Sequence, residues 1–358
     1  MADIRSLERT LSDNVALPKA RCNFVAKFLV ALLQVKTTNL SEIAQVFSGR
    51  ARPDSHYKRI QRFLRFFDLP LSVVALLIVK LLPIEGPFVL TLDRTNWQLG
   101  QTPLNLLVLG IAYKGVSFPL LWTVLEKRGN SNTAERIALM NQFIALFGVA
   151  RIAYLTADRE FIGKQWFHWL RHQHIDFRIR VKENTQVMNT RGQLMPVWKL
   201  FRAQRVGCPL VGESARQCWG LKLYFSGLRL PSGEYVIVAA PKFTGTALDE
   251  YRVRWGIETL FGCLKSRGFR LEETHVTDPQ RLAKLLALLA LSFSWAHLVG
   301  EWLAKAEALR INQLKTHGRR AKSLFRHGLD YLRRILCNLT SFAQQAAFRR
   351  VIQLLSCT

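Results

Sequence analysis

The chain has 358 residues, and 49% of them are hydrophobic. A chain of this length and composition can bury at least one large core, so it is not a disordered basic tail. Lys and Arg number 51 and Asp and Glu number 25, so the formal net charge is 51 − 25 = +26, with a pI near 10.5. This charge favours an anionic partner, either nucleic acid or an anionic membrane surface.

Composition along the chain argues against insertion into a membrane, and a protein that binds a membrane surface is left as a distant alternative. The most apolar stretch, Leu285–Val299, is short and contains two serines and a histidine, and Leu71–Leu82 is shorter still and carries Lys80. A spanning helix needs roughly 20 apolar residues, so both stretches are predicted to be buried core helices. The N-terminus has no apolar signal region, and the six cysteines show no C-x-x-C spacing. These features predict a cytoplasmic protein with free thiols.

Residues 1–85 are predicted to be helical. Apolar side chains recur at helical spacing in Lys19–Val35. The sequence Asn39-Leu-Ser-Glu42 has the form of a capping box, which opens a helix that runs through Phe47 and is broken by Gly49. A second helix, His56–Phe67, is expected to be capped by Asp54 or Ser55.

The helix His56–Phe67 has a basic side and an apolar side. A helix, a turn with glycine and a basic helix together resemble a helix-turn-helix DNA reader. The alternative is a solvated basic face on an ordinary helical bundle, and the charge of the whole chain favours DNA. The predicted DNA-binding side chains are Lys58, Arg59, Arg62 and Arg65.

Residues 86–182 are predicted to form three strands, a helix, a strand, a helix and a last strand. The expected strands are Phe88–Leu92, Leu104–Tyr113, Phe118–Leu125, Ile152–Thr156 and Asp176–Val181, with helices from Asn132 to Gly148 and near Ile162–His172.

The next part of the chain is predicted to be an insertion rich in β-structure. Alternating apolar residues on both sides of Pro231-Ser-Gly233 predict a β-hairpin of Leu221–Leu230 and Glu234–Ala240. The remainder, 270–358, is predicted to be helical and strongly basic in its second half, where it could contact DNA, form a dimer or be a solvated face. The basic residues there are Arg319, Arg320, Lys322, Arg326, Arg333 and Arg334.

Three acidic residues are the candidates for catalysis. Asp93 and Asp158 each end an apolar run that is predicted to be a strand, and Glu258 lies in a segment with helical periodicity. Carboxylates at the ends of buried strands are costly unless they are neutralised. A divalent metal bound through oxygen ligands is the usual neutraliser of such a cluster. In a very basic chain, this predicts metal-assisted chemistry on phosphodiesters.

The segment around Glu258 is the most specific signal. Relative to Tyr251, the residues Arg254, Glu258 and Lys265 fall near −60°, −20° and −40° on one continuous helical wheel, at about 100° per residue. A stripe of phenol, guanidinium, carboxylate and ammonium groups would suit a site that holds a metal and grips phosphates. The alternative is a surface helix with an Arg254–Glu258 pair, worth only ~0.2–0.5 kcal/mol.

The motif Y-x2-R-x3-E-x6-K, after two aspartates on predicted strands, resembles the YREK signature of DDE transposases from bacterial insertion sequences, in the IS-four-type family with the transposon-five-like enzymes. The flanks Leu92-Asp93-Arg94-Thr95-Asn96-Trp97 and Thr156-Ala-Asp158-Arg-Glu-Phe161 resemble the family's two aspartate motifs, and the likeness covers about residues 40 to 290.

This resemblance implies the fold and the division of the chain. The expected fold class is α/β, an RNase-H-like (retroviral integrase-like) catalytic core with a β-rich insertion, flanked by helical regions. In that fold the first and fourth strands are neighbours, so Asp93 and Asp158 would meet. The predicted parts are a helical DNA-binding region (1–85), the catalytic core (86–182 and 246–290), the insertion (183–245) and a basic helical C-terminal region (291–358).

The resemblance also implies the chemistry. Two carboxylates about 4 Å apart would repel by roughly 4 kcal/mol at an effective dielectric near 20, so three require counter-charge. Two Mg²⁺ ions are expected, with Mn²⁺ as a substitute. Asp93 would bridge both ions, and Asp158 and Glu258 would each hold one. Tyr251, Arg254 and Lys265 would bind phosphates, while Arg94 and Arg159 could assist or could hold the carboxylates without metal.

The expected partners are double-stranded DNA, as terminal inverted repeats and as target, and a second copy of the chain in a dimer on paired ends. The expected location is the bacterial cytoplasm, on the nucleoid. In the resembling enzymes an aromatic residue of the insertion stacks on a base flipped out of the duplex, and Trp219 is the candidate here, with Trp198 as its competitor.

The predicted function is therefore cleavage at transposon ends and joining of the 3′-hydroxyls to target DNA. Two alternatives remain at this point. One is an RNase-H-like nuclease or resolvase that cuts without joining, and the other is a non-catalytic DNA-binding protein derived from a transposase.

Overall fold

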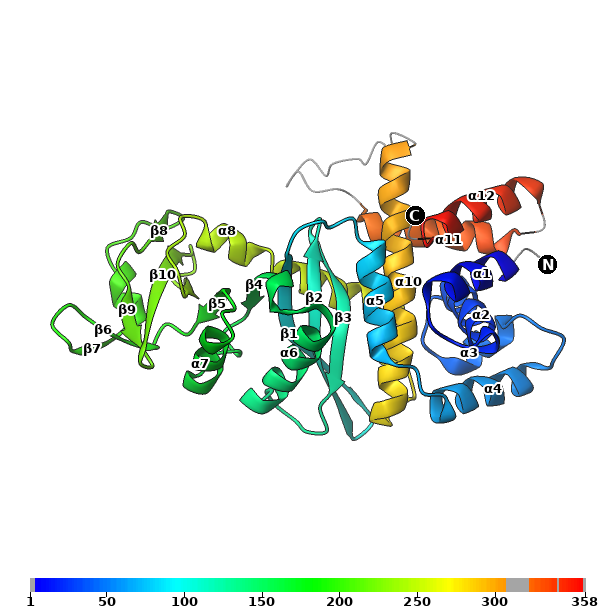
Figure 1. Cartoon of the computed structure of the whole chain (residues 1–358), viewed down its shortest axis with the longest axis horizontal. Helices are drawn as coiled ribbons and strands as arrows, with labels where there is room; N and C mark the ends of the chain where they lie inside the picture. The colour runs from blue at the N-terminus through cyan, green and yellow to red at the C-terminus, as the bar shows by residue number, and fades with distance from the viewer. Residues whose placement is uncertain (1–3, 307–321, 340, 357–358) are drawn as a thin grey trace. The chain divides into compact units, whose positions relative to one another are not determined.

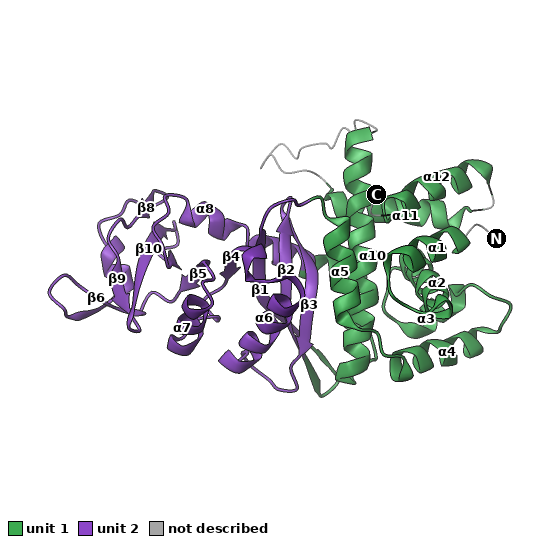
Figure 2. Cartoon of the chain, viewed as in Figure 1, with its two compact units in different colours: residues 1–83, 97–104, 261–358 green, residues 84–96, 105–260 purple. Residues whose placement is uncertain are grey.

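A computed structural model describes residues 4–306, 322–339 and 341–356. The chain divides into two compact units (Figure 2). Unit 1 comprises residues 1–83, 97–104 and 261–358, and unit 2 comprises residues 84–96 and 105–260.

Unit 2 is built on a mixed sheet with strand order β3-β2-β1-β4-β5-β11-β10-β8 (Figure 1). Its first part runs antiparallel at β2–β3 and parallel at β1–β4 and β4–β5. The pairing of β1 with β4 is the one expected for an RNase-H-like fold, and the α/β fold class is confirmed. The strands are β1 (Phe88–Leu99), β2 (Thr102–Tyr113), β3 (Val116–Val124), β4 (Ile152–Ala157), β5 (Phe177–Val181), β8 (Pro209–Val211), β10 (Leu221–Arg229) and β11 (Tyr235–Ala240).

Close packing in the centre of this sheet requires a glycine. The hydroxyl oxygens of Thr91 and Ser117 lie 2.6 Å apart in the interior. A Cβ at Gly110 would come within 2.2 Å of the Ser117 hydroxyl and 2.8 Å of the Phe118 carbonyl oxygen. A side chain at residue 110 would therefore separate β2 from its neighbour β3.

Two helices follow the order that the sequence predicts. Helix α6 (Thr133–Phe147) begins with a complete capping box, in which Asn132 Oδ1 accepts from Glu135 N and Glu135 Oε2 accepts from Asn132 N. Gly148, with φ +78°, ends it. Helix α7 (Lys164–His172) lies between β4 and β5 in the chain.

The predicted insertion contains short strands and the predicted hairpin. Strands β10 and β11 are antiparallel, from Arg229↔Tyr235 to Tyr224↔Ala240, which confirms the hairpin. Strand β11 also pairs with β5, so the hairpin extends the main sheet. The other short strands are β6 (Gln186–Met188), β7 (Leu194–Pro196) and β9 (Arg216–Cys218).

The segment with the predicted YREK stripe is not one helix. Helix α8 (Ala247–Arg252) ends in a turn, and α9 (Trp255–Leu264) begins after it. Arg254 lies in this turn, and Lys265 lies just beyond α9. The continuous helical wheel was therefore wrong, because periodicity does not reveal a break of two residues.

Unit 1 is helical. Its helices are α1 (Ile4–Asn14), α2 (Lys19–Val35), α3 (Leu40–Val46), α4 (Pro53–Phe66), α5 (Leu71–Leu81), α10 (Pro279–Ala306), α11 (Leu324–Cys337) and α12 (Phe342–Gln353). Helix α10 packs against α2, α4, α5 and α11. The α10–α11 contact is a close backbone approach, since a Cβ at Gly300 would lie 1.8 Å from the Leu324 carbonyl oxygen.

The start of the basic helix differs from the prediction. Arg52 is the N-cap residue of α4 and Pro53 is in its first turn, so neither Asp54 nor Ser55 caps it. Proline suits the first helical position because the missing N–H would have no helical partner there. Helix α3 does use Asn39 as its cap, whose side chain accepts from Ser41 N.

Helix α10 is the one described helix that is long and apolar enough to cross a membrane, and 83% of its most apolar window is buried inside the structure. That burial identifies Leu285–Val299 as part of a core helix, as predicted. The five cysteines within the described ranges are free thiols. Arg319 and Arg320 of the predicted basic tail lie outside the described residues.

The two units do not follow the four predicted parts. Helices α1–α5 and α10–α12 belong to unit 1, and the predicted insertion belongs to unit 2. The predicted core is divided: most of it lies in unit 2, but its residues 97–104 and 261–290 lie in unit 1. The N- and C-terminal helices pack together, with α2 against both α10 and α11. The division into functional domains stays a prediction.

Candidate active site

The two aspartates lie side by side on neighbouring strands. In the parallel pair β1–β4, Leu92 is opposite Ala157. Asp93 follows Leu92 in β1, and Asp158 follows Ala157, the last residue of β4. Neighbouring strands lie about 4.8 Å apart, so the two carboxyl groups come from adjacent backbones. Asp93 is in the middle of β1, because β1 continues to Leu99. The predicted meeting of these residues is confirmed at the level of strand register.

Helix α8 delivers the next side chains, and polar contacts fix it to the sheet. Arg178 on β5 pairs with Glu250, and the Tyr154 hydroxyl on β4 donates to the Glu250 carbonyl oxygen at 3.3 Å. Glu250 is followed by Tyr251, which is buried. The hydroxyl of Tyr251 donates to Asp158 Oδ1 at 3.3 Å. The position of Tyr251 over Asp158 therefore depends on the last turn of α8.

Arg254 joins the other two carboxylates. Its Nη1 donates to Asp93 Oδ2 at 2.9 Å, and its Nη2 donates to Glu258. The Arg254 side chain is buried, Asp93 is 13% exposed and Glu258 is 40% exposed. The Arg254–Glu258 pair of the surface-helix alternative does form, but the arginine is in the interior and is shared with Asp93. The predicted stripe is replaced by a cluster around one guanidinium group.

Burial dominates the electrostatics of the cluster. Desolvation raises the pKa of Asp93 from 3.8 to about 7, against the opposing effects of Arg254 and of the Arg94 N–H, with Glu160 and Asp158 adding to the rise. Desolvation also raises the pKa of Tyr251 to about 12. Burial disfavours the charged form of Arg254, but Tyr251, Asp93 and Glu258 outweigh it and raise its pKa. An arginine that is charged at all relevant pH values therefore faces an aspartate that is costly to ionise.

The arginines beside the aspartates have structural partners. Arg94 pairs with Glu160 at 3.3 Å and donates to Asn105 and Asn130. Arg159 pairs with Glu234 at 3.1 Å. Neither side chain contacts Asp93 or Asp158 in the described hydrogen bonds, although the backbone N–H groups of both arginines donate to those carboxylates at 2.7 Å.

The three carboxylates have the chemistry of a metal site but not its arrangement. Among the described residues, no three His, Cys, Asp or Glu side chains are arranged to hold one ion. Their chemistry nevertheless fits a hard divalent cation, because all three donors are carboxylates and Asp93 is largely desolvated. Arg254 supplies the positive charge between Asp93 and Glu258. Two metals at this place would require the guanidinium group to move.

A cavity of about 520 Å³ opens beside the cluster. Asp158, Tyr251, Arg254 and Glu258 line one part of it. Another part is apolar and comes from the insertion and α8, through Pro209, Val211, Leu228, Leu230, Val236 and Leu248.

Trp255 is a site residue that the sequence analysis missed. It lines this cavity, is 59% exposed and lies under the Arg254 guanidinium, whose carbon is 5.4 Å from the ring centroid. If Tyr251 to Lys265 formed one continuous helix, the side chain of Trp255 would point away from the predicted stripe of Tyr251, Arg254, Glu258 and Lys265. The sequence signal that could have identified Trp255 is its position directly after Arg254.

The predicted base-stacking residues do not line this cavity. Trp219 packs edge-on against Phe167 at 5.1 Å, and His168 Nε2 donates to the Trp219 carbonyl oxygen at 2.8 Å. Trp198 lies 6.5 Å from the ring of Tyr235. The role of Trp219 in stacking on a base stays a prediction.

Lys265 belongs to unit 1. Its Nζ pairs with Glu272 at 3.0 Å and lies 5.5 Å from the ring centroid of Trp97. These partners hold the lysine in a local cluster of unit 1, and its contact with phosphate stays a prediction.

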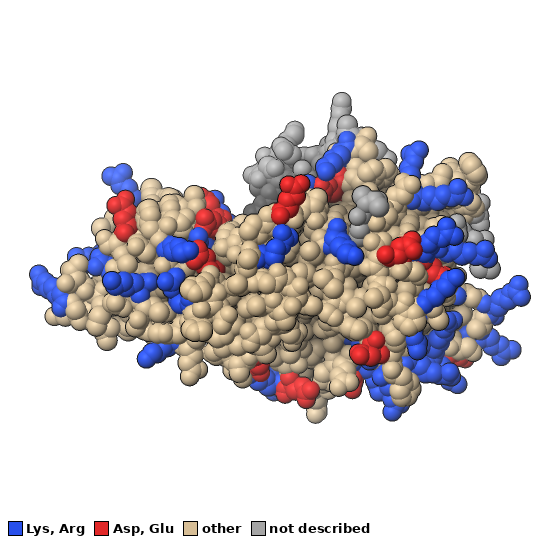
Figure 3. Space-filling view, viewed as in Figure 1, with Lys and Arg blue, Asp and Glu red and all other residues tan. Residues whose placement is uncertain are grey.

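The four predicted DNA-binding residues of α4 are all exposed. His56, Ile60, Phe63 and Leu64 form the buried side of the helix. The opposite side carries Lys58, Arg59, Arg62 and Arg65, and none of the four has an ion pair with a described residue. Blue side chains gather over this helix in the space-filling view (Figure 3). The predicted division into a basic and an apolar side is confirmed.

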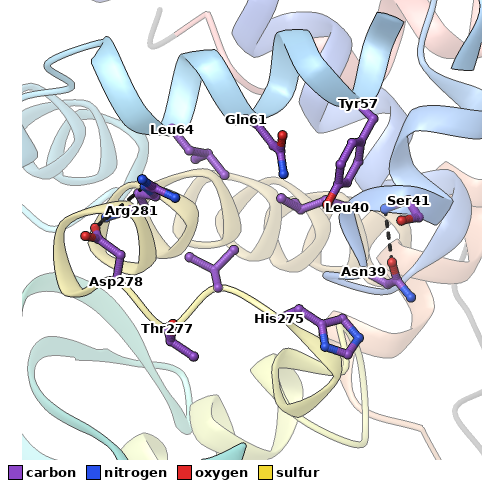
Figure 4. A pocket seen from close by; sticks show the side chains of 11 residues that line it. Asn39, Leu40, Ser41, Tyr57, Gln61, Leu64, His275, Thr277, Asp278 and Arg281 are labelled. Atoms are coloured by element: carbon purple, nitrogen blue, oxygen red, sulfur yellow. Dashed lines mark hydrogen bonds and ion pairs between the residues drawn. The ribbon is translucent and has the colours of Figure 1, made fainter. Parts of the chain in front are cut away.

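A smaller cavity of about 140 Å³ lies beside α4 in unit 1 (Figure 4). Tyr57, Gln61 and Leu64 of α4 line it, together with the starts of α3 and α10. Its one carboxylate, Asp278, accepts from Arg281 N at 2.8 Å. The cavity therefore has no carboxylate cluster and is not a second metal site.

Comparisons with known proteins identify a family to which this chain is similar. Residues 89–295, more than half of the chain, match the family described as a transposase DDE domain. A solved structure of a piggyBac transposase synaptic complex with hairpin DNA is similar with a TM-score of 0.43 and 12% identity, over 91% of this chain and 75% of that chain. No curated protein matches. The span matched by the family includes both aspartates, Arg254 and Glu258, so the chain belongs to the transposase DDE domain family.

Proposed function

We propose that this chain is a DNA transposase that cleaves at the ends of a mobile element and joins the resulting 3′-hydroxyls to target DNA. The single observation that carries the proposal is the cluster in which Asp93, Asp158 and Glu258 surround Tyr251 and Arg254. It lies in a chain of the transposase DDE family with a net charge of +26.

The proposed subgroup is the IS-four-type family with the YREK signature. The support is that Tyr251, Arg254 and Glu258 each contact a carboxylate of the cluster or belong to it. Such contacts would explain the spacing Y-x2-R-x3-E in a segment that is not one helix.

The proposed metal ligands are Asp93, Asp158 and Glu258. Bound Mg²⁺ would activate the attacking hydroxyl and stabilise the leaving 3′-oxygen of the phosphodiester. In the metal-free protein, Arg254 supplies the positive charge that neutralises Asp93 and Glu258. When it leaves them, Arg254 can offer its planar fork to a DNA phosphate.

Tyr251 is a proposed positioning and phosphate-binding residue. Its hydroxyl has a raised pKa, so it remains a donor at neutral pH. It can hold Asp158 in place, or donate to a non-bridging phosphate oxygen. Lys265 is a proposed further phosphate contact, where an ammonium group acts as a point charge.

The proposed DNA-binding surface is the exposed side of α4. Four exposed cations on one helical side can contact the phosphates that border a groove. We further propose that two copies act on paired ends, since both ends of an element have to be joined to one target.

The test is cleavage of the DNA that flanks the coding region. Purified protein with Mg²⁺ is expected to nick the duplex that ends the element and, with target DNA present, to form joined products. Asp93→Asn is expected to abolish both activities and to leave binding to the same duplex unchanged. Mn²⁺ is expected to replace Mg²⁺.

Two outcomes contradict the proposal. Full cleavage by Asp93→Asn would remove Asp93 from the chemistry. Cleavage without joined products, under conditions in which the ends are processed to 3′-hydroxyls, would identify a nuclease or resolvase instead.

A further inference from the structure

Helix α4 ends in an aromatic side chain that the fold does not use. Phe66 is 73% exposed. Phe63, one turn earlier, is buried and stacks on Phe24 with a centroid distance of 4.0 Å. The core of unit 1 therefore takes one phenyl group of this helix and leaves the other in solvent.

Phe66 lies within the basic face. At about 100° per residue, Arg59, Phe66 and Arg62 fall at 0°, −20° and −60°, with Lys58 and Arg65 at about −100° and −120°. The ring is thus flanked by arginines on both sides, and the Arg65 guanidinium carbon is 5.2 Å from its centroid.

Charge decides which partner this face can take. Four cations around one ring repel a basic partner and attract a polyanion. A second copy of this chain, with its own net charge of +26, would bring the same four cations against this face, so self-association through it is disfavoured. A DNA duplex matches the charge, and its major groove admits an α-helix.

Phosphates alone do not account for a phenyl group at this position. Contacts between lysine or arginine and the phosphates fix the register of a protein on DNA, but these contacts carry no sequence information. An apolar side chain in the major groove can contact the C5 methyl group of thymine.

We propose that Phe66 is a specificity-determining residue, which contacts a thymine methyl group in the major groove when α4 binds the terminal repeat. This inference rests on the proposed function and names the chemical group that the helix reads. Lys58, Arg59, Arg62 and Arg65 then supply the phosphate contacts around it.

The experiment uses the full chain and a duplex that the wild-type protein enriches from a random-sequence pool. Burying a phenyl group contributes about 1.5–3 kcal/mol, so Phe66→Ala is expected to weaken binding to that duplex by about 10-fold to 100-fold. Binding to a random duplex is expected to change less than twofold. Phe342→Ala is the matched control, because Phe342 is 84% exposed on α12 of the same unit.

A second arm tests the methyl group itself. Uracil replaces thymine at one position at a time in the enriched duplex, which removes the methyl group and keeps the base pair. At the contacted position the wild-type protein is expected to lose about fourfold in affinity, from ~0.8 kcal/mol per buried methyl-sized group. Phe66→Ala is expected to lose nothing further there.

Three results overturn the inference. The first is an affinity of Phe66→Ala for the enriched duplex that equals that of the wild type. The second is a loss of affinity in Phe342→Ala as large as in Phe66→Ala. The third is a uracil effect of the same size in the wild type and in Phe66→Ala. Cleavage of the element's ends by the wild-type protein is unaffected by these results, so the proposed function is tested separately. Thermal unfolding of each variant confirms that it is folded.

Discussion

Arg254 has the most demanding environment of the residues in the active site. It is buried, and its two terminal nitrogens serve Asp93 and Glu258. A buried charge without its partner is far more costly than the pair is stabilising. The arginine thus holds together a cluster whose proposed function requires the carboxylates to face DNA and metal.

Arg254→Ala is expected to destabilise the metal-free protein by about 3–5 kcal/mol, because Asp93 then lacks a counter-charge. Adding Mg²⁺ is expected to restore part of this loss. Chemical denaturation with a chelator and then with Mg²⁺ measures both effects. Arg252→Ala is the control, since its ion pair with Asp249 is on the surface and should contribute less than about 1 kcal/mol. Equal effects of the two substitutions would contradict the assigned role.

The pH dependence of stability follows from Asp93. Its pKa is about 7 in the folded protein and 3.8 when unperturbed. Below pH 3.8 it is protonated in both states. Between 3.8 and 7 the unfolded chain releases the proton first, so the contribution of this group to the free energy of unfolding falls as pH rises, and it stays at its minimum above 7.

Asp93→Asn is neutral at every pH. Its stability relative to the wild type, measured by denaturation in the presence of a chelator, is therefore expected to increase from about pH 4 to about pH 7 and then to level off. A difference that does not change with pH would show that Asp93 is not desolvated.

Among the elements, α9 determines where Glu258 lies. Its second residue, Gly256, packs on β3, and a Cβ there would lie 2.9 Å from the Val116 carbonyl carbon and 3.0 Å from Ser117 N. Both contacts are with backbone, which cannot rotate away. The helix and the strand are therefore held at a distance that only glycine permits.

Gly256→Ala is expected to destabilise unit 2 by about 1–3 kcal/mol and to lower the cleavage rate, because α9 has to shift with Glu258. Binding to duplex DNA through α4 should not change. Gly86→Ala is the control, because no atom lies within 4 Å of its added Cβ and its φ is not positive. Thermal unfolding and single-turnover cleavage measure the two effects, and a fully active Gly256→Ala would contradict the close contact.

At the scale of the whole molecule, charge determines how the protein meets its substrate. The excess of 26 positive charges is a property of the full chain, and α4 concentrates four of them on one exposed side. Binding to DNA should therefore weaken steeply as salt increases.

Each phosphate contact adds about 0.9 to the slope of log affinity against log salt concentration. Replacing Lys58, Arg59, Arg62 and Arg65 by Ala together is expected to reduce that slope by about 3–4. Titration of a fluorescent duplex at several salt concentrations gives the slope. An unchanged slope would remove α4 from the DNA-binding surface.

Local patterns in the sequence were sufficient for most of the elements, whereas the pairing of β1 with β4 was implied by the family resemblance. Apolar runs predicted β1 and β4, alternation predicted the β10–β11 hairpin, and Asn132 was predicted to open α6. The start of α4 was wrong because Pro53 at the first position outweighs the capping potential of Asp54.

The sequence by itself indicated the three carboxylates and the two faces of α4, because these depend on residue chemistry and on short-range periodicity. The fold class was indicated by the resemblance of its motifs to a known family. Only the tertiary structure decided that Arg254 leaves the helix to join Asp93 to Glu258, that Trp255 lines the cavity and that Phe66 remains exposed. Those outcomes depend on a two-residue break in a helix and on which side chain finds space in a core. Neither is encoded in the spacing of residues along the chain, since both result from contacts between segments far apart in it.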